Sequence, residues 1–369
     1  MGALGKSTTP PPRAAPIDAA SAARTRDSLR VVLQSCMQGV CNLGWLLPVW
    51  DERITRFNAS YAVGACDGVT VEFVFKGAAR QGDFNVWYSS VPGWGFARPN
   101  LFFSIESPGF EPWQTQLSPM RFDGDIGYEQ SSTIWRPYFR PHDLWRLRPN
   151  LRFEPTQRRS VGIWVGNCRS QERNEIIRAL LNATDYRVES HGGCLRNVDT
   201  PAGRGRPPMV PACERHRVML AVENTVCDGY ITEKMTNAMK CGAVPLVLSH
   251  GGYPGYDRHL GAFPRIDAGT AGWLQQVRRV MLDDTYYAWF VAQGASPPST
   301  LREVPDLSCQ FARKQRSREW NGSHLPRREC LSAKWSSVPA RQGGRANHTA
   351  PNARNESTFL NRSTRMRKR

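Results

Sequence analysis

The chain has 369 residues, of which 40% are hydrophobic, and it contains 12 Trp. This length and composition suit two globular domains with packed cores, and they exclude a wholly disordered chain. The formal net charge is +17, but residues 311–369 alone hold 15 Lys and Arg against 3 Asp and Glu. Because aromatic residues do not interleave with this basic tail, a nucleic-acid partner is not expected.

The ten cysteines form no Cys-x-x-Cys pair, which argues against a zinc site. Six Asn-x-Ser/Thr sequons are present, and four of them lie in the last fifty residues. Sequons and cysteines together indicate a lumenal protein with disulfides, whose pairing the sequence does not give. No apolar run reaches the about 20 residues of a membrane-spanning helix, and the N-terminus lacks the apolar core of a signal peptide. We therefore expect membrane association only through an anchor that is not present in this chain.

Residues 1–27 are rich in Pro, Ala and Ser, which is typical of a disordered, stem-like segment. The chain then alternates short apolar runs with turn clusters, and this pattern predicts a first α/β domain over residues 28–155. Its strands are expected at residues 29–33, 69–75 and 101–105.

Glu106 directly follows the last of these strands and precedes Ser107 and Pro108. By default, a Glu at this position is a turn residue or a local cap. At the end of a strand that faces a cleft, its carboxylate can instead take a proton from an attacking hydroxyl group, as a general base. We favour the general base.

Residues 141–158 are charged and contain several prolines, which is typical of a linker, and a second α/β domain is expected over residues 156–300. It begins with an apolar strand at 161–165, a polar loop that contains Asn167, and a helix. Arg173 lies at the start of this helix, where an Arg is normally only a solvated charge. Opposite a diphosphate, its planar guanidinium group would bind two phosphate oxygens at once.

A further strand is expected from Tyr186, followed by a Gly-rich loop that contains Gly193. His191 in this region is expected to be a hydrogen-bonded loop residue rather than a catalyst.

The pattern is clearest between residues 217 and 248. An apolar run at 218–222 predicts a buried strand, and a polar loop follows at 223–230. Apolar residues then recur at helical spacing, Gly242 ends the helix, and a second apolar run starts at Ala243. Strand, loop, helix and strand in this order predict a parallel βαβ unit.

In βαβ units, ligands bind where the first strand passes into the helix. Lys234 lies in the first turn of the predicted helix, where unpaired N–H groups and the helix dipole also favour an anion such as a diphosphate. Glu223 and Glu233 are hydrogen-bond acceptors at neutral pH and suit sugar hydroxyl groups. Asn224 and Tyr230 lie on the same rim. The alternative is an ordinary helix with a solvated lysine.

Two short sequence motifs at a fixed spacing favour a diphosphate site over an ordinary helix with a solvated lysine. Residues 221–225 (AVENT) and 230–234 (YITEK) closely resemble the donor-site signature of the α1,3/α1,4-fucosyltransferases, glycosyltransferase family 10; Val222 stands where that family usually has Phe. The string GGC-x-RN at 192–197 resembles, more narrowly, the plant-type core α1,3-fucosyltransferases. Glu106-Ser-Pro resembles the acceptor half of the family, but the segment after Tyr128 departs from the family pattern, which leaves the acceptor contacts open.

The resemblance implies a GT-B-like α/β fold, with two Rossmann-like domains that face each other across a cleft, and disordered tails. The C-terminal tail would comprise residues 301–369. The implied reaction is the inverting transfer of L-fucose from GDP-fucose to a GlcNAc hydroxyl group, in α1,3 linkage, on the core of an N-glycan. The alternatives are fucosylation of a Lewis-type lactosamine, and a catalytically inactive protein that binds a nucleotide sugar or a polyanion.

The resemblance also implies the roles of individual residues. Glu106 would be the catalytic base, and no residue would ligate a metal. No cofactor is expected to be required, and a divalent metal would at most stimulate the reaction. The partners would be GDP-fucose and a glycan or glycoprotein acceptor, and the location would be the Golgi lumen. The expected donor-binding residues are Arg173, Glu223, Asn224, Tyr230, Glu233 and Lys234, with Asn167 and Gly193 in adjoining donor loops.

Overall fold

The structure, a computed structural model, describes residues 28–35, 43, 46–47, 54–58, 61–76, 83–88, 99–104, 122–147, 160–198, 213, 215–250, 252–293, 297, 301, 303–317 and 330. The chain divides into the units Met1–Ala333 and Lys334–Arg369, and all described residues belong to the first unit. The predicted base Glu106 and the predicted stem-like segment 1–27 lie outside the described residues.

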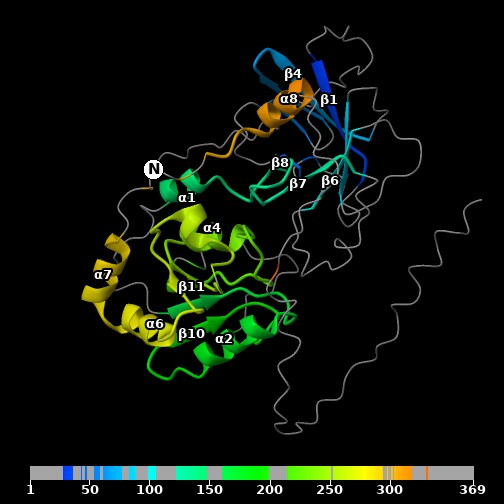
Figure 1. Cartoon of the computed structure of the whole chain (residues 1–369). Coiled ribbons are helices and arrows are strands. Elements are labelled where there is room, and N and C mark those ends of the chain that lie inside the picture. Colours follow the sequence, from blue (N-terminus) through cyan, green and yellow to red (C-terminus); the bar gives the residue numbers. More distant parts are fainter. Residues whose placement is uncertain are drawn as a thin grey trace, which may run out of the picture. The chain divides into compact units, whose positions relative to one another are not determined.

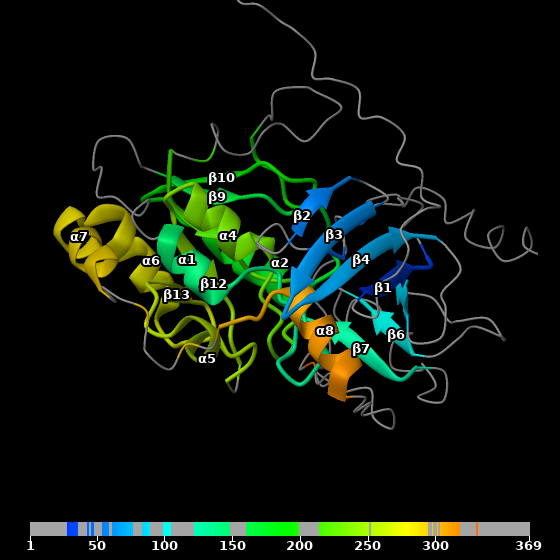
Figure 2. The same cartoon turned by 90° about the horizontal axis from the view of Figure 1, so that it is seen from above.

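The first sheet has eight strands in the order β2-β3-β4-β1-β5-β6-β7-β8. The strands β4, β1, β5, β6, β7 and β8 are parallel, whereas β2 and β3 pair antiparallel with their neighbours, β3 joining β4. Strands β5 and β6 are buried along their whole length, as expected for central strands covered on both faces. Figure 2 shows β2, β3, β4 and β1 side by side, with β6 and β7 beyond them. The strands are β1 Ser28–Leu33, β2 Ile54–Phe57, β3 Tyr61–Cys66, β4 Val69–Phe75, β5 Phe84–Tyr88, β6 Asn100–Phe103, β7 Gly124–Gly127 and β8 Ile134–Trp135.

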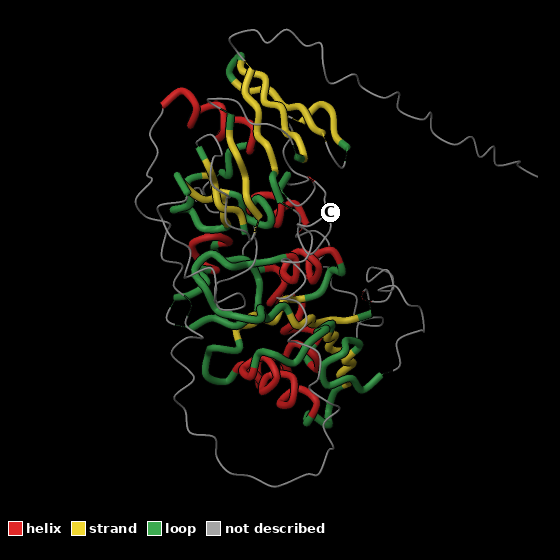
Figure 3. Tube along the Cα trace, turned by 90° about the vertical axis from the view of Figure 1, so that its right-hand side faces the viewer, coloured by secondary structure: helices red, strands yellow, loops and turns green. Residues whose placement is uncertain are grey.

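The second sheet has five parallel strands in the order β10-β9-β11-β12-β13. Helices follow these strands in the sequence and cover both faces of the sheet: Figure 1 shows α4 on one side and α2 and α6 on the other, and Figure 3 shows the helices in red. The strands are β9 Ser160–Ile163, β10 Arg187–Ser190, β11 His216–Leu220, β12 Val244–Val247 and β13 Ile266–Asp267. The helices are α2 Gln171–Leu181, α4 Glu233–Lys240, α5 Tyr256–Leu260, α6 Trp273–Leu282 and α7 Asp284–Ala292.

The βαβ unit predicted from residues 217–248 is present as β11, α4 and β12. The apolar positions of α4 that recur at helical spacing, Met235, Ala238 and Met239, are buried in the core of the second sheet. Gly242 follows the helix with a φ of 63°, a left-handed backbone conformation that ends helices and suits glycine.

The predicted linker at 141–158 is partly wrong. Helix α1 occupies Pro141–Leu147, and Trp145 packs edge-to-face on Phe263 with 5.2 Å between the ring centroids. Trp145 and the preceding Phe139 belong to the hydrophobic core of the second sheet. Both residues therefore pack with the second sheet although they precede residue 155, because two large aromatic side chains outweigh the charged and proline-rich composition of the segment.

The predicted disordered tail also begins too early. Helix α8, Leu307–Ser317, packs on the first sheet beside β3 and β4 (Figure 1). Phe311 is fully buried, and its ring lies 5.0 Å from that of Phe84 and 5.9 Å from that of Phe73. A disulfide between Cys66 and Cys309 fixes the helix to β3. The basic composition of the segment led to the prediction of disorder, although one face of the helix is apolar.

In the part of the chain that the structure describes, no helix is both long and apolar enough to cross a membrane. Two of the sequon asparagines, Asn58 and Asn182, are described, and both are exposed to solvent.

Candidate active site

The strand order of the second sheet defines where a ligand is expected to bind. In chain order the five strands are β9, β10, β11, β12 and β13, so their arrangement in the sheet reads 2-1-3-4-5. From β9 the chain adds β10 on one side of the sheet, and it then returns to the other side of β9 to add β11, β12 and β13. Ligands of doubly wound sheets bind beyond the carboxyl ends of the two strands that flank such a reversal. The loops that follow β9 and β11 therefore form the candidate site.

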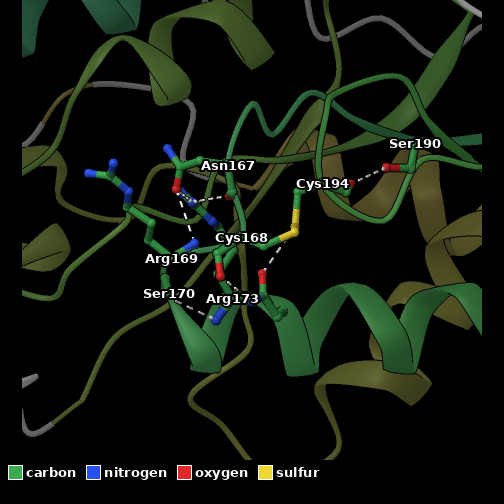
Figure 4. Close-up of a disulfide and its surroundings, with 8 residues drawn as sticks. Asn167, Cys168, Arg169, Ser170, Arg173, Ser190 and Cys194 are labelled. Atoms are coloured by element: carbon green, nitrogen blue, oxygen red, sulfur yellow. Dashed lines mark hydrogen bonds between the residues drawn. A yellow bond between two sulfur atoms is a disulfide. The ribbon is translucent and has the colours of Figure 1, made fainter. Parts of the chain in front are cut away.

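Asn167 lies in the loop after β9, and Arg173 lies in the first turn of α2, the helix that follows this loop (Figure 4). Ser170 caps helix α2 by accepting a hydrogen bond from the backbone N–H of Arg173, which fixes the start of the helix. The guanidinium group of Arg173 turns back along the loop, and its Nη2 donates to the backbone oxygen of Asn167 at 3.1 Å and to Asn167 Oδ1 at 3.4 Å. Arg173 and Asn167 thus form one local hydrogen-bonded unit.

Arg173 is almost completely buried, with 2% of its surface exposed. No acceptor among the described residues lies within hydrogen-bond distance of its Nε. Burial lowers the pKa of this arginine, and Glu223 and Tyr230 oppose the shift. A buried guanidinium group with an unused donor is costly unless an acceptor binds to it. This arrangement suits an anionic ligand.

The loop after β10 is joined to the loop after β9 by the disulfide Cys168–Cys194 (Figure 4). The two loops also lie in backbone contact: Cys194 N–H donates to the backbone oxygen of Val165 at 3.0 Å. A Cβ atom on Gly192 would lie 2.0 Å from that same oxygen, and one on Gly193 would lie 2.7 Å from the backbone oxygen of Gly166. Only glycine permits this approach, which explains the Gly-Gly-Cys string.

The loop after β11 is organised around the buried carboxylate of Glu223. The backbone N–H of Thr232 donates to Glu223 Oε1 at 2.8 Å, and the Thr232 hydroxyl group contacts both carboxylate oxygens. Lys234 Nζ lies 2.8 Å from Glu223 Oε2 and donates to Thr232 Oγ1 at 2.9 Å. Thr232 is also the N-cap of α4. Glu223 therefore holds both the start of the helix and the lysine in place.

Burial raises the pKa of Glu223, and Lys234 opposes the shift. For Lys234, burial lowers the pKa, but Glu223 and Glu233 outweigh burial and leave it raised. Lys234 is thus a cation over the whole physiological pH range. Because Glu223 also acts on Arg173, one carboxylate interacts electrostatically with both cations, which lie in the first turns of α2 and α4.

The remaining predicted donor-binding residues occupy different environments. Glu233 is exposed and lies 3.2 Å from Lys234 Nζ. Asn224 is half-buried, and no donor in the described part of the chain reaches its Oδ1. Tyr230 is buried, with its ring 5.0 Å from that of Tyr128 and 6.1 Å from that of Tyr138. Binding of the donor by these residues stays a prediction.

Thr232 is the residue that the sequence analysis missed. It lies inside the recognised signature, but its position directly before the helix was not used to predict an N-cap, although Thr is a preferred residue there. Its hydroxyl group joins Glu223 to Lys234, and this contact links residues that are 11 positions apart in the sequence.

Two further disulfides lie in or next to the loop after β11 and the helix that follows it. Cys227 lies within the loop and is bonded to Cys330, while Cys213, before β11, is bonded to Cys241 at the end of α4. Both candidate loops are therefore held by covalent links in addition to hydrogen bonds. Such restraints reduce the loss of conformational freedom that accompanies ligand binding.

Replacement of both Cys168 and Cys194 by serine is expected to weaken GDP binding about 10-fold, because the loop that precedes Arg173 would have to be ordered by the ligand. Isothermal titration calorimetry measures this loss. The matched control replaces Cys66 and Cys309, which lie on the first sheet, and should lower the melting temperature without changing GDP affinity. Equal GDP affinity in all three proteins would show that the disulfide does not support the site.

Comparison with known proteins agrees with this geometry. The family model "Glycosyltransferase family 10 (fucosyltransferase) C-term" matches residues 155–261, which include both candidate loops. This part of the chain is similar to glycosyltransferase family 10. The match begins just before β9 and ends just after α5, so it covers β9 to β12, the helices between them, and α5.

The curated relatives each match a short stretch of the chain. A fucosyltransferase-like protein of Arabidopsis thaliana is 34% identical over 94 residues, which is 25% of this chain and 17% of that protein. The "GDP-fucose protein O-fucosyltransferase 3" of Homo sapiens is 40% identical over 81 residues, which is 20% of this chain and 16% of that protein. The matched region thus spans less than a fifth of the length of either relative.

Solved structures resemble a larger part of the chain. A crystal structure of an α1,3-fucosyltransferase with GDP has a TM-score of 0.52 at 13% identity, and it covers 80% of this chain and 90% of its own. A second crystal structure of an α1,3-fucosyltransferase, with GDP-fucose, has a TM-score of 0.53 at 14% identity. The match covers 83% of this chain and 94% of that chain. The GT-B-like α/β fold inferred from the sequence is confirmed.

Proposed function

We propose that this protein transfers L-fucose from GDP-fucose to an acceptor hydroxyl group. The observation that supports this proposal most strongly is the placement of Arg173 and Lys234 in the first turns of α2 and α4, the helices that follow the two loops beside the strand reversal, with Glu223 interacting with both. The chemistry of two cations and a helix N-terminus suits a nucleotide diphosphate. The family 10 match covers these loops, and the names of the relatives refer to fucosyl transfer.

In this proposal, Arg173 and Lys234 bind the diphosphate of the donor. Negative charge grows on the departing phosphate as the bond to the fucose anomeric carbon breaks, and cations that are already in place stabilise that charge. Glu223 then acts chiefly by holding Lys234 and the N-terminus of α4 in position. Asn224 and Glu233 remain available for hydroxyl groups of the donor. No metal is assigned to this step, since two side-chain cations already neutralise the leaving group.

For the acceptor, we propose a GlcNAc hydroxyl group of a glycan, in α1,3 linkage, with the N-glycan core as the first candidate and a lactosamine as the second. A different acceptor class, a Ser or Thr hydroxyl group of a protein, is favoured by one observation. Relatives that are 40% identical over 81 residues are named protein O-fucosyltransferases. The similarity covers only 20% of this chain, so it does not choose among these acceptors.

The experiment is a transfer assay with GDP-fucose and three acceptors offered side by side: an N-glycan core, a lactosamine and a folded Ser/Thr-containing protein domain. Mass spectrometry detects addition of one deoxyhexose, and exoglycosidase digestion identifies the linkage. Fucose on GlcNAc supports the first acceptor class, and fucose on a Ser or Thr supports the second. A protein that binds GDP-fucose but neither transfers nor hydrolyses it would be a binding protein, and the proposal would be wrong.

Glu106 is the proposed catalytic base, on the basis of its resemblance to the acceptor half of the family. Replacement by Gln removes the proton acceptor but preserves size and polarity, so we expect turnover to fall about 100- to 10,000-fold with GDP-fucose affinity unchanged. Steady-state transfer rates and calorimetric titration with GDP-fucose measure the two effects separately. An active Glu106→Gln protein would remove this residue from the mechanism.

We also propose that the reaction takes place in an oxidising lumen such as that of the Golgi. Four disulfides within the described residues and the two exposed sequon asparagines support this location, because disulfides persist in such compartments. Enzymatic deglycosylation of the protein expressed in a eukaryotic host tests it: a decrease in mass is expected, and an unglycosylated product would contradict it.

A further inference from the structure

A polar cluster lies on one face of the second sheet, on the strands β9, β10 and β11 and on the residue that directly follows β10. Side chains alternate along a strand, so Val161 and Ile163 of β9 face the apolar core, whereas Ser160, Gly162 and Trp164 point to the opposite side. The neighbouring strands place Glu189 of β10 opposite Gly162, and His216 of β11 opposite Ser160.

Three side chains meet on this face: Glu189, His191 and His216. All three are buried, and one potential ligand atom from each lies within 4.8 Å of the others. The imidazole of His216 reaches across β9 because residue 162 is glycine; a Cβ atom there would lie 2.6 Å from Cδ2 of His216. Trp164 stacks on His191 at 4.4 Å between ring centroids and so limits the freedom of that ring.

The orientation of His216 leaves one ring nitrogen unused. Its Nδ1 lies 2.7 Å from the hydroxyl oxygen of Ser160, and its Nε2 has no hydrogen-bond partner in the part of the chain that the structure describes. His216 is 0% exposed, so water does not reach this nitrogen from the surface. A buried ring nitrogen without a partner is unfavourable, whereas a metal-binding histidine usually has its other ring nitrogen held by a hydrogen bond, as His216 has from Ser160.

One ligand pair of the cluster has the spacing that is expected around a tetrahedral ion. His191 Nε2 lies 3.3 Å from Glu189 Oε2, and two ligands that each lie about 2.0–2.1 Å from zinc are roughly 3.3 Å apart.

We propose that Glu189, His191 and His216 bind a zinc ion. Zinc is the choice because two imidazoles and one carboxylate form a common zinc ligand set. Arg187 and Arg215 now pair with the Glu189 carboxylate, but their side chains are 70% and 51% exposed and can turn to solvent at little cost. The ion would join β10 to β11 across β9 and so stabilise the sheet, independently of the proposed transfer reaction.

This site also explains why the sequence indicated no metal. The absence of a Cys-x-x-Cys pair excludes only thiolate sites with that spacing. Here the ligands are a carboxylate and two imidazoles, and His216 joins the other two only because β11 and β10 both flank β9 in the sheet.

The test is calorimetric titration of the untagged, chelator-treated full chain with Zn²⁺, together with the visible absorption of bound Co²⁺, which reports tetrahedral coordination. We expect one equivalent of Zn²⁺ and an intense Co²⁺ spectrum. Ser160→Ala should weaken Zn²⁺ binding about 10- to 100-fold, because the hydroxyl group that orients His216 is lost. His216→Gln should weaken it further, and the matched control, His142→Gln on α1, should bind as the wild type does.

Circular dichroism shows whether each variant is folded, and Ser160→Ala decides the question if His216→Gln does not fold. A wild-type protein that does not bind one equivalent of Zn²⁺ per chain would overturn the proposal. So would equal Zn²⁺ affinities of folded Ser160→Ala, His216→Gln and His142→Gln proteins.

Discussion

Replacement of Lys234 by alanine is expected to weaken GDP binding about 10- to 100-fold, since hydrogen bonds to charged groups contribute about 1.5–3 kcal/mol. The loss in fucosyl transfer should be larger, about 100- to 1,000-fold, because charge on the leaving phosphate increases toward the transition state. Calorimetric titration with GDP and steady-state transfer rates measure the two losses.

The control for this variant is Lys240→Ala, which removes the same charge from the exposed end of the same helix, α4. It should bind GDP as the wild type does. If Lys234→Ala and Lys240→Ala behave alike, Lys234 does not contact the diphosphate.

Removal of Lys234 also leaves the buried Glu223 carboxylate without its cation, which destabilises the loop. A second variant separates this effect from donor binding. The double replacement of Glu223 and Lys234 by Gln keeps hydrogen-bonding groups of similar size and removes both charges. We expect it to melt close to the wild-type temperature and still to bind GDP about 10- to 100-fold more weakly. Wild-type affinity in this protein would assign the effect of Lys234→Ala to misfolding of the loop.

Replacement of Arg173 by Lys is expected to weaken GDP binding about 10- to 100-fold even though the charge is kept. The guanidinium group can bind two phosphate oxygens at once, and an ammonium group cannot reproduce that geometry. The Lys side chain would also lose the two hydrogen bonds from Arg173 Nη2 to Asn167. The affinity for GDP and for GMP, which lacks the second phosphate, measures whether the loss depends on the diphosphate.

Arg178→Lys is the matched control for this change. Arg178 lies on the exposed face of α2, so its replacement should leave GDP affinity unchanged. A loss for Arg173→Lys that is equal for GDP and GMP would mean that Arg173 does not bind the β-phosphate.

The sequence predicted the βαβ unit of β11, α4 and β12 because each signal there was local. The apolar runs gave the strands, the spacing of Met235, Ala238 and Met239 gave the helix, and Gly242 gave its end. The position of Lys234 at the helix start followed directly from these signals. The strand reversal between β9 and β11 could not be predicted, because it depends on the order of the strands in the sheet.

Long-range packing set the limit of prediction elsewhere. Helix α8 joins the first sheet through Phe311 and a disulfide to Cys66, far away in the sequence, and the basic composition of the segment pointed the other way. Pairing among the ten cysteines is likewise a property of the fold. The role of Glu223 was only partly predicted: an acceptor-rich side chain was expected to face sugar hydroxyl groups, whereas its oxygens are engaged by Thr232 and Lys234.

A crystal structure of the protein with GDP bound tests the central claim most directly. We predict that oxygens of one diphosphate lie within about 3.2 Å of both the Arg173 guanidinium group and Lys234 Nζ. A GDP molecule that contacts only one of these side chains, or that binds away from the loops after β9 and β11, would contradict the claim that the two cations form a single donor site.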